Sequence, residues 1–322
     1  MKKNDSLLEI ATQLNKAKKV AIFCHARPDG DTIGSGTALC QALKNAGKTA
    51  FVICEEAPAE KFLFLDGVEE IKTELPQEEF DTFISVDCGE LNRLGCFASL
   101  FSKFKGVTIN IDHHVISNVG FAKYNYVLQR PATAEILPEV LQSAGFALNK
   151  KIANLIMLGL ITDTGSFLHA DVTENTFLVA SILKKHGADV HFINYNLYSK
   201  QSKQRALLYG KVLSKIRFAL EDKLGIITVS LDDMQWAGAN KSMTEGFVDF
   251  ALTIDSVEVS AAIMEVKANQ YKVSLRSKGK VNVNAVASTF GGGGHVLASG
   301  CMLFGEYEEV IEKLTYAVYQ NL

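Results

Sequence analysis

The sequence predicts an α/β protein in which a doubly wound, mainly parallel sheet domain precedes a smaller mixed-sheet α/β domain. In the first part of the chain, short apolar runs alternate with helical or loop-like segments, which is typical of parallel sheets covered by helices. The 322 residues exceed the length at which one core usually stops growing, so we expect two domains. Apolar residues make up 48% of the chain, enough to give each domain its own core.

Four short apolar runs predict buried strands in the first domain. They follow an opening helix and cover residues 20–24, 50–54, 82–86 and 107–111. Helices are expected over 33–46, which Gly47 closes, over 133–144, and over 174–186, which Thr173 caps and Gly187 ends. The apolar stretch 152–161 is longer than most strands and favours a buried helix.

A polar segment over 194–205 indicates the boundary between the domains. We place the first domain at 1–190, a helical linker at 191–212 and the second domain at 213–322. In the second domain, runs at 224–230, 257–266 and 271–276 predict a mixed sheet, and helices are expected at 244–254 and 307–319. The active site is expected in the cleft between the two domains.

Charge, the N-terminus and the cysteines exclude several classes of protein. A net charge of −3 lacks the basic surplus with which proteins bind long nucleic-acid duplexes, so any nucleic acid should be short. The charged, amphipathic start MKKNDSLLEIATQL has no long apolar run, which predicts a cytoplasmic protein without a membrane partner. The six cysteines include no CxxC pair, so we expect buried, reduced thiols rather than disulfides or a zinc site.

Acidic and histidine side chains follow the ends of three predicted strands and the long buried segment. They are His25, Asp29, Asp31, Asp87, Asp112, His113, His114 and Asp163. Strand ends in an open α/β sheet form the edge where ligands bind. A single acid there is usually a helix cap or turn residue, but clustered carboxylates repel one another unless cations offset their charge. The pattern therefore predicts bound metal ions.

The types of ligand atom predict the chemistry. Oxygen and imidazole without thiolate suit manganese, magnesium or iron better than a structural zinc site. Paired metals about 3.5–4 Å apart stabilise both the attacking and the leaving oxygens of phosphoryl displacement, so we expect phosphoester hydrolysis with two ions. We predict Mn²⁺, with Co²⁺ or Mg²⁺ as substitutes. The helix beginning near Ile33 would add backbone N–H groups for a phosphate oxygen.

The order of these motifs resembles the DHH phosphoesterase superfamily. Its four motifs match His25-x-x-x-Asp29-x-Asp31, then Asp87, then Asp112-His113-His114, and then Asp163. Near the C-terminus, Gly291-Gly-Gly-Gly-His295 resembles the glycine-rich loop of the DHH-associated domain in the oligoribonuclease and phosphoadenosine-phosphate phosphatase branch. Together the two resemblances span nearly the whole chain.

The resemblance implies a division of roles among these residues. One metal would be held by His25, Asp29 and Asp87, and the other by Asp31, Asp87, His113 and Asp163. Asp87 would bridge the two metals and act in catalysis. His114 would approach the scissile phosphate as a second catalytic residue, while Asp112 orients its neighbours.

Candidate substrate contacts lie mostly in the second domain. They are Arg276, Ser277, Gly292, Gly293, Gly294 and His295, together with Thr133 of the first domain. Glycines permit close approach of a ligand, although a flexible turn is the alternative. Arg93 also resembles a family position, but structural pairing at a helix start is equally compatible. The chain departs from the family pattern at Arg130-Pro131-Ala132 and again from Val296 onward, and neither change touches a predicted metal ligand.

The resemblance to this branch implies hydrolysis of RNA fragments of about two to five nucleotides, and removal of the 3′ phosphate from adenosine 3′,5′-bisphosphate. A phosphodiesterase for linear or cyclic dinucleotides is a close alternative, because it would use the same metals with another base pocket. An inorganic pyrophosphatase ranks third, since its second domain lacks the glycine loop. A non-catalytic nucleotide sensor is disfavoured because every expected ligand is retained. A homodimer remains open.

Overall fold

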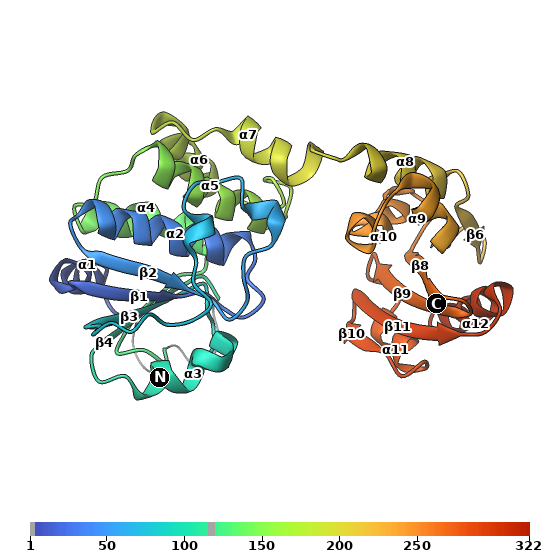
Figure 1. Cartoon of the computed structure of the whole chain (residues 1–322), viewed down its shortest axis with the longest axis horizontal. Helices are drawn as coiled ribbons and strands as arrows, with labels where there is room; N and C mark the ends of the chain where they lie inside the picture. Colours follow the sequence, from blue (N-terminus) through green and yellow to red (C-terminus); the bar gives the residue numbers. More distant parts are fainter. Residues whose placement is uncertain (1–3, 115–119) are drawn as a thin grey trace. The chain divides into compact units, whose positions relative to one another are not determined.

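The computed structural model describes residues 4–114 and 120–322, which form two compact units (Figure 1). Unit 1 is Met1–Lys200 and unit 2 is Gln201–Leu322. The division between them falls inside 191–212, the segment expected to link two domains.

Unit 1 is built on a five-stranded parallel sheet with spatial order β2-β1-β3-β4-β5. Its strands are β1 (Lys19–Phe23), β2 (Thr49–Ile53), β3 (Thr82–Val86), β4 (Val107–Asp112) and β5 (Tyr124–Val127). The central strands β1, β3 and β4 are almost wholly buried, which explains why they read as continuous apolar runs. The edge strand β5 was not predicted, because four residues are too few to show a period.

Helices cover both faces of this sheet, so the predicted doubly wound class is confirmed. Figure 1 shows α2, α4 and α5 on one face and α3 on the other. The α-helices are α1 (Leu7–Lys16), α2 (Gly30–Asn45), α3 (Ala98–Lys103), α4 (Thr133–Ser143), α5 (Lys150–Asp163), α6 (Glu174–Lys185) and α7 (Val190–Asn194). Shorter helical turns are η1 (Glu60–Phe62), η2 (Val68–Glu70), η3 (Leu91–Phe97) and η4 (Tyr195–Ser199).

Two helices show how local sequence sets the ends of these elements. The predicted helix at 152–161 is confirmed as α5, which Asn149 caps by accepting the N–H of Ile152. Helix α2 begins at Gly30, three residues before the predicted start. Asp29 explains the difference, because its side chain caps the helix by accepting the N–H groups of Asp31 and Thr32. These two residues therefore lie in the first turn of α2.

Unit 2 contains a mixed six-stranded sheet with spatial order β10-β11-β9-β8-β7-β6. The strands are β6 (Arg217–Ala219), β7 (Leu224–Val229), β8 (Val259–Lys267), β9 (Gln270–Ser277), β10 (Gly293–His295) and β11 (Ala298–Phe304). Only β7 and β8 pair in parallel within this sheet of the described chain. One face packs against α11 (Val283–Ser288) and α12 (Tyr307–Tyr319). Part of the other packs against α8 (Lys203–Leu213), α9 (Leu231–Ala237) and α10 (Phe247–Phe250).

The helix predicted over 244–254 is present only in part, because helical structure begins at Phe247. Gly246 adopts φ 79°, a left-handed conformation, and separates η5 (Lys241–Thr244) from α10. The turn η6 (Ala251–Thr253) then follows α10 directly. Residues 247–253 are therefore helical as two consecutive short elements, α10 and η6, instead of one longer helix.

Two expectations about the chain as a whole can be compared with the structure. None of the described helices combines the length and apolar character needed to cross a membrane. The six cysteines are free thiols, as predicted. Five are buried, but Cys96 is exposed, so the expectation of burial is wrong for that residue.

Candidate metal centre

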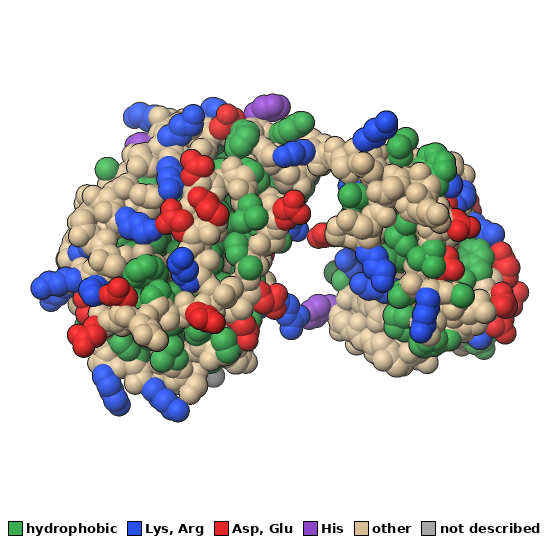
Figure 2. Space-filling model, in the orientation of Figure 1, with side chains coloured by type: hydrophobic (Ala, Val, Ile, Leu, Met, Phe, Trp, Pro, Cys, Tyr) green, Lys and Arg blue, Asp and Glu red, His purple; other side chains and the backbone are tan. Residues whose placement is uncertain are grey.

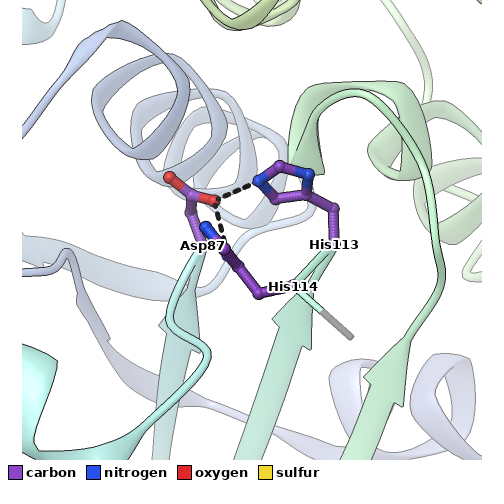
Figure 3. A group of neighbouring side chains, drawn as sticks. All are labelled: Asp87, His113 and His114. Carbon is purple, nitrogen blue, oxygen red and sulfur yellow. Dashed lines mark ion pairs between the residues drawn. The ribbon is translucent and has the colours of Figure 1, made fainter. Parts of the chain in front are cut away.

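The predicted acids and histidines meet at the carboxyl edge of the unit 1 sheet. Ligand atoms lie within 4.8 Å of one another in three overlapping groups: His25-Asp29-Asp87, Asp31-His113-Asp163 and Asp87-His113-His114. Figure 3 shows both His113 and His114 directed at the carboxylate of Asp87. Residues more than a hundred positions apart in sequence therefore form one cluster.

Asp87 lies at the centre of the cluster. Its Oδ2 is 3.4 Å from His25 Nε2, and its Oδ1 is 3.3 Å from His113 Nε2 and 3.7 Å from His114 Nδ1. The two oxygens of one carboxylate thus face different histidines. The backbone of Asp87 has φ 58°, a conformation that costs a non-glycine residue roughly 1–3 kcal/mol. The turn after β3 bears this strain and directs the carboxylate into the cluster.

Two imidazole nitrogens have the surroundings of metal ligands. His25 Nδ1 lies 2.9 Å from the Ala26 carbonyl oxygen, and His113 Nδ1 lies 2.9 Å from that of Arg130. With Nδ1 donating, the neutral ring presents a lone pair at Nε2. Both Nε2 atoms are buried and have no hydrogen-bond partner among the described residues. A cation beside the carboxylates would satisfy them, so the donor set fits a metal.

The charges in the cluster perturb one another strongly. Burial and then the charges of Asp87 and Asp163 raise the pKa of Asp31 well above its ordinary value. Burial and then Asp87 raise the pKa of Asp163 to about 7. Burial alone would raise the pKa of Asp87, but the partners His113 and His25 outweigh it and lower that pKa.

The histidines respond in the opposite sense. Burial lowers the pKa of His25, but Asp29 and Asp87 outweigh it and raise the value to about 10. For His113 burial also lowers the pKa, and Asp87 followed by Asp31 raises it to about 10. Bound cations would have to displace these protons, so metal binding should release them.

Asp29 acts as a helix cap as well as a member of the cluster. Its Oδ1 accepts the N–H groups of Asp31 and Thr32 at 3.1 Å each, while Oδ2 lies 3.5 Å from His25 Nε2. The N–H of Ile33 donates to the Asp29 carbonyl oxygen. These three donors at the start of α2 are occupied within the chain, so they do not offer N–H groups to a phosphate oxygen.

Asp31 holds the beginning of α4. Its Oδ2 accepts the N–H of Thr133 at 2.6 Å, and its Oδ1 accepts that of Ala134 at 2.9 Å and the Ser35 hydroxyl at 3.1 Å. Thr133, which we predicted as a substrate contact, is fully buried and donates its hydroxyl to Asp87 Oδ1 at 3.0 Å. This placement gives Thr133 a supporting contact inside the cluster.

Sequence reasoning did not single out Gly159 of α5. A Cβ at this position would lie 2.5 Å from Asp31 Oδ1 and 2.8 Å from the Ala134 Cβ, so only glycine leaves room for both. An isolated glycine inside an apolar helical run was the available signal.

The DHH segment also orients its third member. His114 Nδ1 lies 2.8 Å from Asp112 Oδ1, and the His114 side chain is 38% exposed.

A pocket of about 480 Å³ lies beside the cluster, and two of its lining residues are Arg27 and Arg93. Arg27 was missed by sequence reasoning, although it lies within the first motif. The pocket presents positive charge next to the carboxylates.

In unit 2, Arg276 and Ser277 lie on opposite faces of β9. The Arg276 side chain is 36% exposed, its Nε is 3.2 Å from Asp249 Oδ1, and it lines a pocket of about 620 Å³ with Lys272 and Met302. Figure 2 shows basic side chains beside exposed hydrophobic ones on the visible face of this unit. Ser277 is buried, and its hydroxyl accepts the N–H of Gly279.

The glycine-rich segment is an ordered hairpin. Strands β10 and β11 pair antiparallel, with His295 opposite Ala298. A Cβ at Gly292 would overlap the Gly300 carbonyl, and one at Gly294 would lie 2.5 Å from the Ala298 carbonyl oxygen. Gly292 and Gly294 therefore have a packing reason, which a flexible turn would not require. His295 is exposed, and Val296 begins the turn that follows it.

Comparison with known proteins agrees with this geometry. A family model described as "DHH family, N-terminal domain" matches residues 19–160, and one described as "DHHA1 domain" matches 226–322. The bifunctional oligoribonuclease and PAP phosphatase NrnA of Thermus thermophilus is 30% identical over 308 residues, covering 94% of this chain and 90% of that protein. A probable manganese-dependent inorganic pyrophosphatase of Streptococcus agalactiae serotype III is 27% identical over 280 residues, covering 79% and 88%.

Among solved structures, an exopolyphosphatase-related protein from Bacteroides fragilis has the same fold. Its TM-score is 0.81 at 27% identity, and the match covers 98% of this chain and 96% of that one. The first domain match lies within unit 1 and the second within unit 2, and the relative from Thermus thermophilus matches across both units. This chain belongs to the DHH family of metal-dependent phosphoesterases and carries a DHHA1 domain after the DHH domain.

Proposed function

We propose that this chain is a two-metal phosphoesterase that cleaves RNA fragments of about two to five nucleotides and dephosphorylates adenosine 3′,5′-bisphosphate at its 3′ position. The observation that carries the proposal is Asp87, whose two oxygens face His25 and His113 separately. A shared carboxylate of this kind suits two neighbouring cations. The relative from Thermus thermophilus, whose name states both activities, supports the choice of substrates.

We propose a division of the ligands between two metals. His25, Asp29 and Asp87 would hold one ion, and Asp31, Asp87, His113 and Asp163 the other. Imidazole nitrogen together with carboxylate oxygen suits Mn²⁺, with Co²⁺ or Mg²⁺ as substitutes. When bound, the two ions supply positive charge at the scissile phosphate and acidify the attacking water.

The protein's own side chains position the substrate. Asp112 fixes the His114 ring, so that His114 can donate a hydrogen bond to the scissile phosphate. Arg27 and Arg93 would hold a second phosphate of the substrate in the adjoining pocket, because guanidinium groups suit bidentate phosphate contacts. A short, multiply charged nucleotide supplies such a group.

Residues 213–322 are proposed to bind the part of the substrate away from the scissile bond. His295 is exposed there, and the half-buried Arg276 side chain lines a pocket open to a nucleotide. We propose that this unit closes over the metals of residues 1–190 when substrate binds. Ser277 and the glycines would then shape the backbone that carries these contacts.

The test is a panel of substrates given to Mn²⁺-loaded protein, with kcat/KM measured for each. The panel contains a dinucleotide, oligonucleotides of increasing length, adenosine 3′,5′-bisphosphate, a cyclic dinucleotide and pyrophosphate. We expect the highest values for the shortest RNAs and the bisphosphate. Preference for the cyclic dinucleotide or for pyrophosphate would establish the corresponding alternative, and no turnover of any substrate would favour a sensor.

A further inference from the structure

Glu135 is a buried acid that no step above uses. It lies in the first turn of α4, and its side chain is 0% exposed. Burying a carboxylate is costly unless its oxygens are bonded to compensating groups. The partners that offset this cost show what the residue holds together.

Each oxygen of Glu135 binds a residue at the start of α6. Oε1 accepts a hydrogen bond from Asn175 Nδ2 at 2.6 Å, and Oε2 accepts one from the Thr176 hydroxyl at 2.7 Å. On the other side, Arg130 Nε lies 3.5 Å from Oε1. One side chain therefore ties α4 both to the start of α6 and to the segment before α4.

These attachments continue to the metal ligands. The carbonyl oxygen of Arg130 lies 2.9 Å from His113 Nδ1 and so fixes the ring whose Nε2 faces the cluster. The N–H groups of Thr133 and Ala134, immediately before Glu135, donate to the two oxygens of Asp31. Displacing the first turn of α4 would therefore displace groups that orient two predicted ligands.

We propose that Glu135 is a positioning residue for the metal centre, acting through the Arg130 carbonyl on His113 and through the start of α4 on Asp31. The inference rests on the proposed metal site. Glu135 touches neither metal nor substrate, so its removal should alter ligand geometry without removing a ligand. Small displacements of supporting groups are enough to weaken a site of this kind.

Glu135→Ala and Glu135→Gln separate the parts of this network. Alanine leaves the half-buried Asn175 amide and the buried Thr176 hydroxyl without their acceptor. Glutamine can accept from Asn175 and donate to the Thr176 hydroxyl, so it loses only the attraction for Arg130. The matched control is Glu139→Ala, one turn later on α4, where the carboxylate accepts from the Tyr126 hydroxyl at 3.0 Å and makes no contact with the cluster.

Three measurements on the full chain test the proposal. Glu135→Ala should bind Mn²⁺ at least about tenfold more weakly than wild type, the typical loss when a group supporting a ligand is removed. The visible spectrum of its Co²⁺ form should change, because the His113 ring is no longer fixed. In metal-free protein, the amides of Arg130 and of residues 132–136 should exchange hydrogen faster. Glu135→Gln keeps the α6 partners but loses the attraction for Arg130, so its Mn²⁺ affinity should lie between those of Glu135→Ala and wild type. Glu139→Ala should match wild type in all three measurements.

Wild-type Mn²⁺ affinity and an unchanged Co²⁺ spectrum in folded Glu135→Ala would overturn the proposal. Equal losses in Glu139→Ala would also overturn it, since they would indicate general loosening of α4. If the alanine variant does not fold, Glu135→Asp decides the question. The shorter side chain keeps the charge but cannot span to both α6 partners, so wild-type affinity in that variant would refute the positioning role.

The failure of this inference differs from failure of the proposed function. If wild-type protein binds Mn²⁺ but cleaves no nucleotide, the proposed activity is wrong, while metal affinity and exchange rates still report on Glu135. If wild-type protein cleaves dinucleotides and Glu135→Ala binds metal like wild type, the activity stands and the positioning role is wrong.

Discussion

Most candidate ligands of unit 1 are buried or half-buried and held by neighbouring groups, with Asp29 as the exposed exception, whereas His295 of unit 2 is exposed and the Arg276 side chain is partly exposed. The side chain of Asp87 is 2% exposed and accepts from Thr133, while that of Arg276 is 36% exposed and His295 lies on the surface. A site built before substrate arrives suits the chemical step. Exposed side chains suit the capture of a substrate, which they surround only after a conformational change closes the site. Changes in unit 1 should therefore affect all substrates, and those in unit 2 chiefly the larger ones.

The largest effect is expected from Asp87→Ala, because both proposed metals lose a ligand. We expect kcat/KM to fall by at least about a thousandfold, about 4 kcal/mol of transition-state stabilisation. The loss should exceed that of Asp29→Ala or Asp31→Ala and should be equal for a dinucleotide and for bis-p-nitrophenyl phosphate. Kinetics on folded variants, checked by circular dichroism, provide the test. Residual activity at or above that of the single-site variants would contradict the bridging role.

Gly159→Ala is expected to disturb the same metal centre by displacing a ligand, although Gly159 is not itself a ligand. The new methyl group would press on Asp31 and Ala134, which should cost about 1–3 kcal/mol of unfolding free energy. Misplacement of a ligand should lower kcat/KM on the order of a hundredfold. Gly210→Ala is the control, since a Cβ there meets nothing within 4 Å. Denaturant unfolding and kinetics measure the two effects, and wild-type values for Gly159→Ala would show that the cluster tolerates displacement.

Arg276→Ala and His295→Ala should have a smaller and selective effect. We expect normal Mn²⁺ binding and a loss of about tenfold in kcat/KM on dinucleotides, about 1.4 kcal/mol. Bis-p-nitrophenyl phosphate should be affected much less, because it has few groups remote from the scissile bond. The kcat/KM of both variants on both substrates is the measurement. Parallel losses on the two substrates would remove the contrast between the units.

The smallest effect concerns stability and pH in the metal-free protein. In the folded protein the pKa of Asp163 is about 7, compared with an ordinary aspartate value of 3.8. The pKa values of His25 and His113 are about 10, compared with an ordinary histidine value of 6.5. Because folding raises each pKa, the stability these groups contribute is full at low pH. It is lost as pH rises through about 7 for the acid and about 10 for the histidines.

The melting temperature of the metal-free protein should therefore decrease as the pH is raised from about 5 to about 9. Excess Mn²⁺ replaces the protons and should remove or reverse this decline, since metal affinity rises as ligands deprotonate. Thermal unfolding in chelator and in Mn²⁺ across this range tests both statements. A metal-free stability that increases with pH would mean that the cluster is not a site of proton uptake.

Much of the site was predictable because its ligands lie next to recognisable elements. Parallel strands end at one edge of a sheet, so the acids and histidines after β1, β3 and β4 had to come near one another. A long apolar run ending in Asp163 predicted the helix that presents this acid. Other elements were missed or misplaced: β5, β6 and β10 are very short, β11 follows the glycine-rich segment, and the positive φ of Gly246 delays the helix expected from residue 244.

The sequence by itself determined the fold class and the edge at which the acids and histidines gather, because apolar period and strand polarity are local properties. Tertiary contacts alone decided which distant residues form hydrogen bonds that position these acids and histidines. Thr133 binds Asp31 across 102 positions, and Glu135 reaches Asn175 across 40. Such pairs leave no periodic signal, since a hydrogen bond between distant segments depends on packing of whole elements. For the same reason Thr133, read from its motif as a substrate contact, lies buried beneath Asp87.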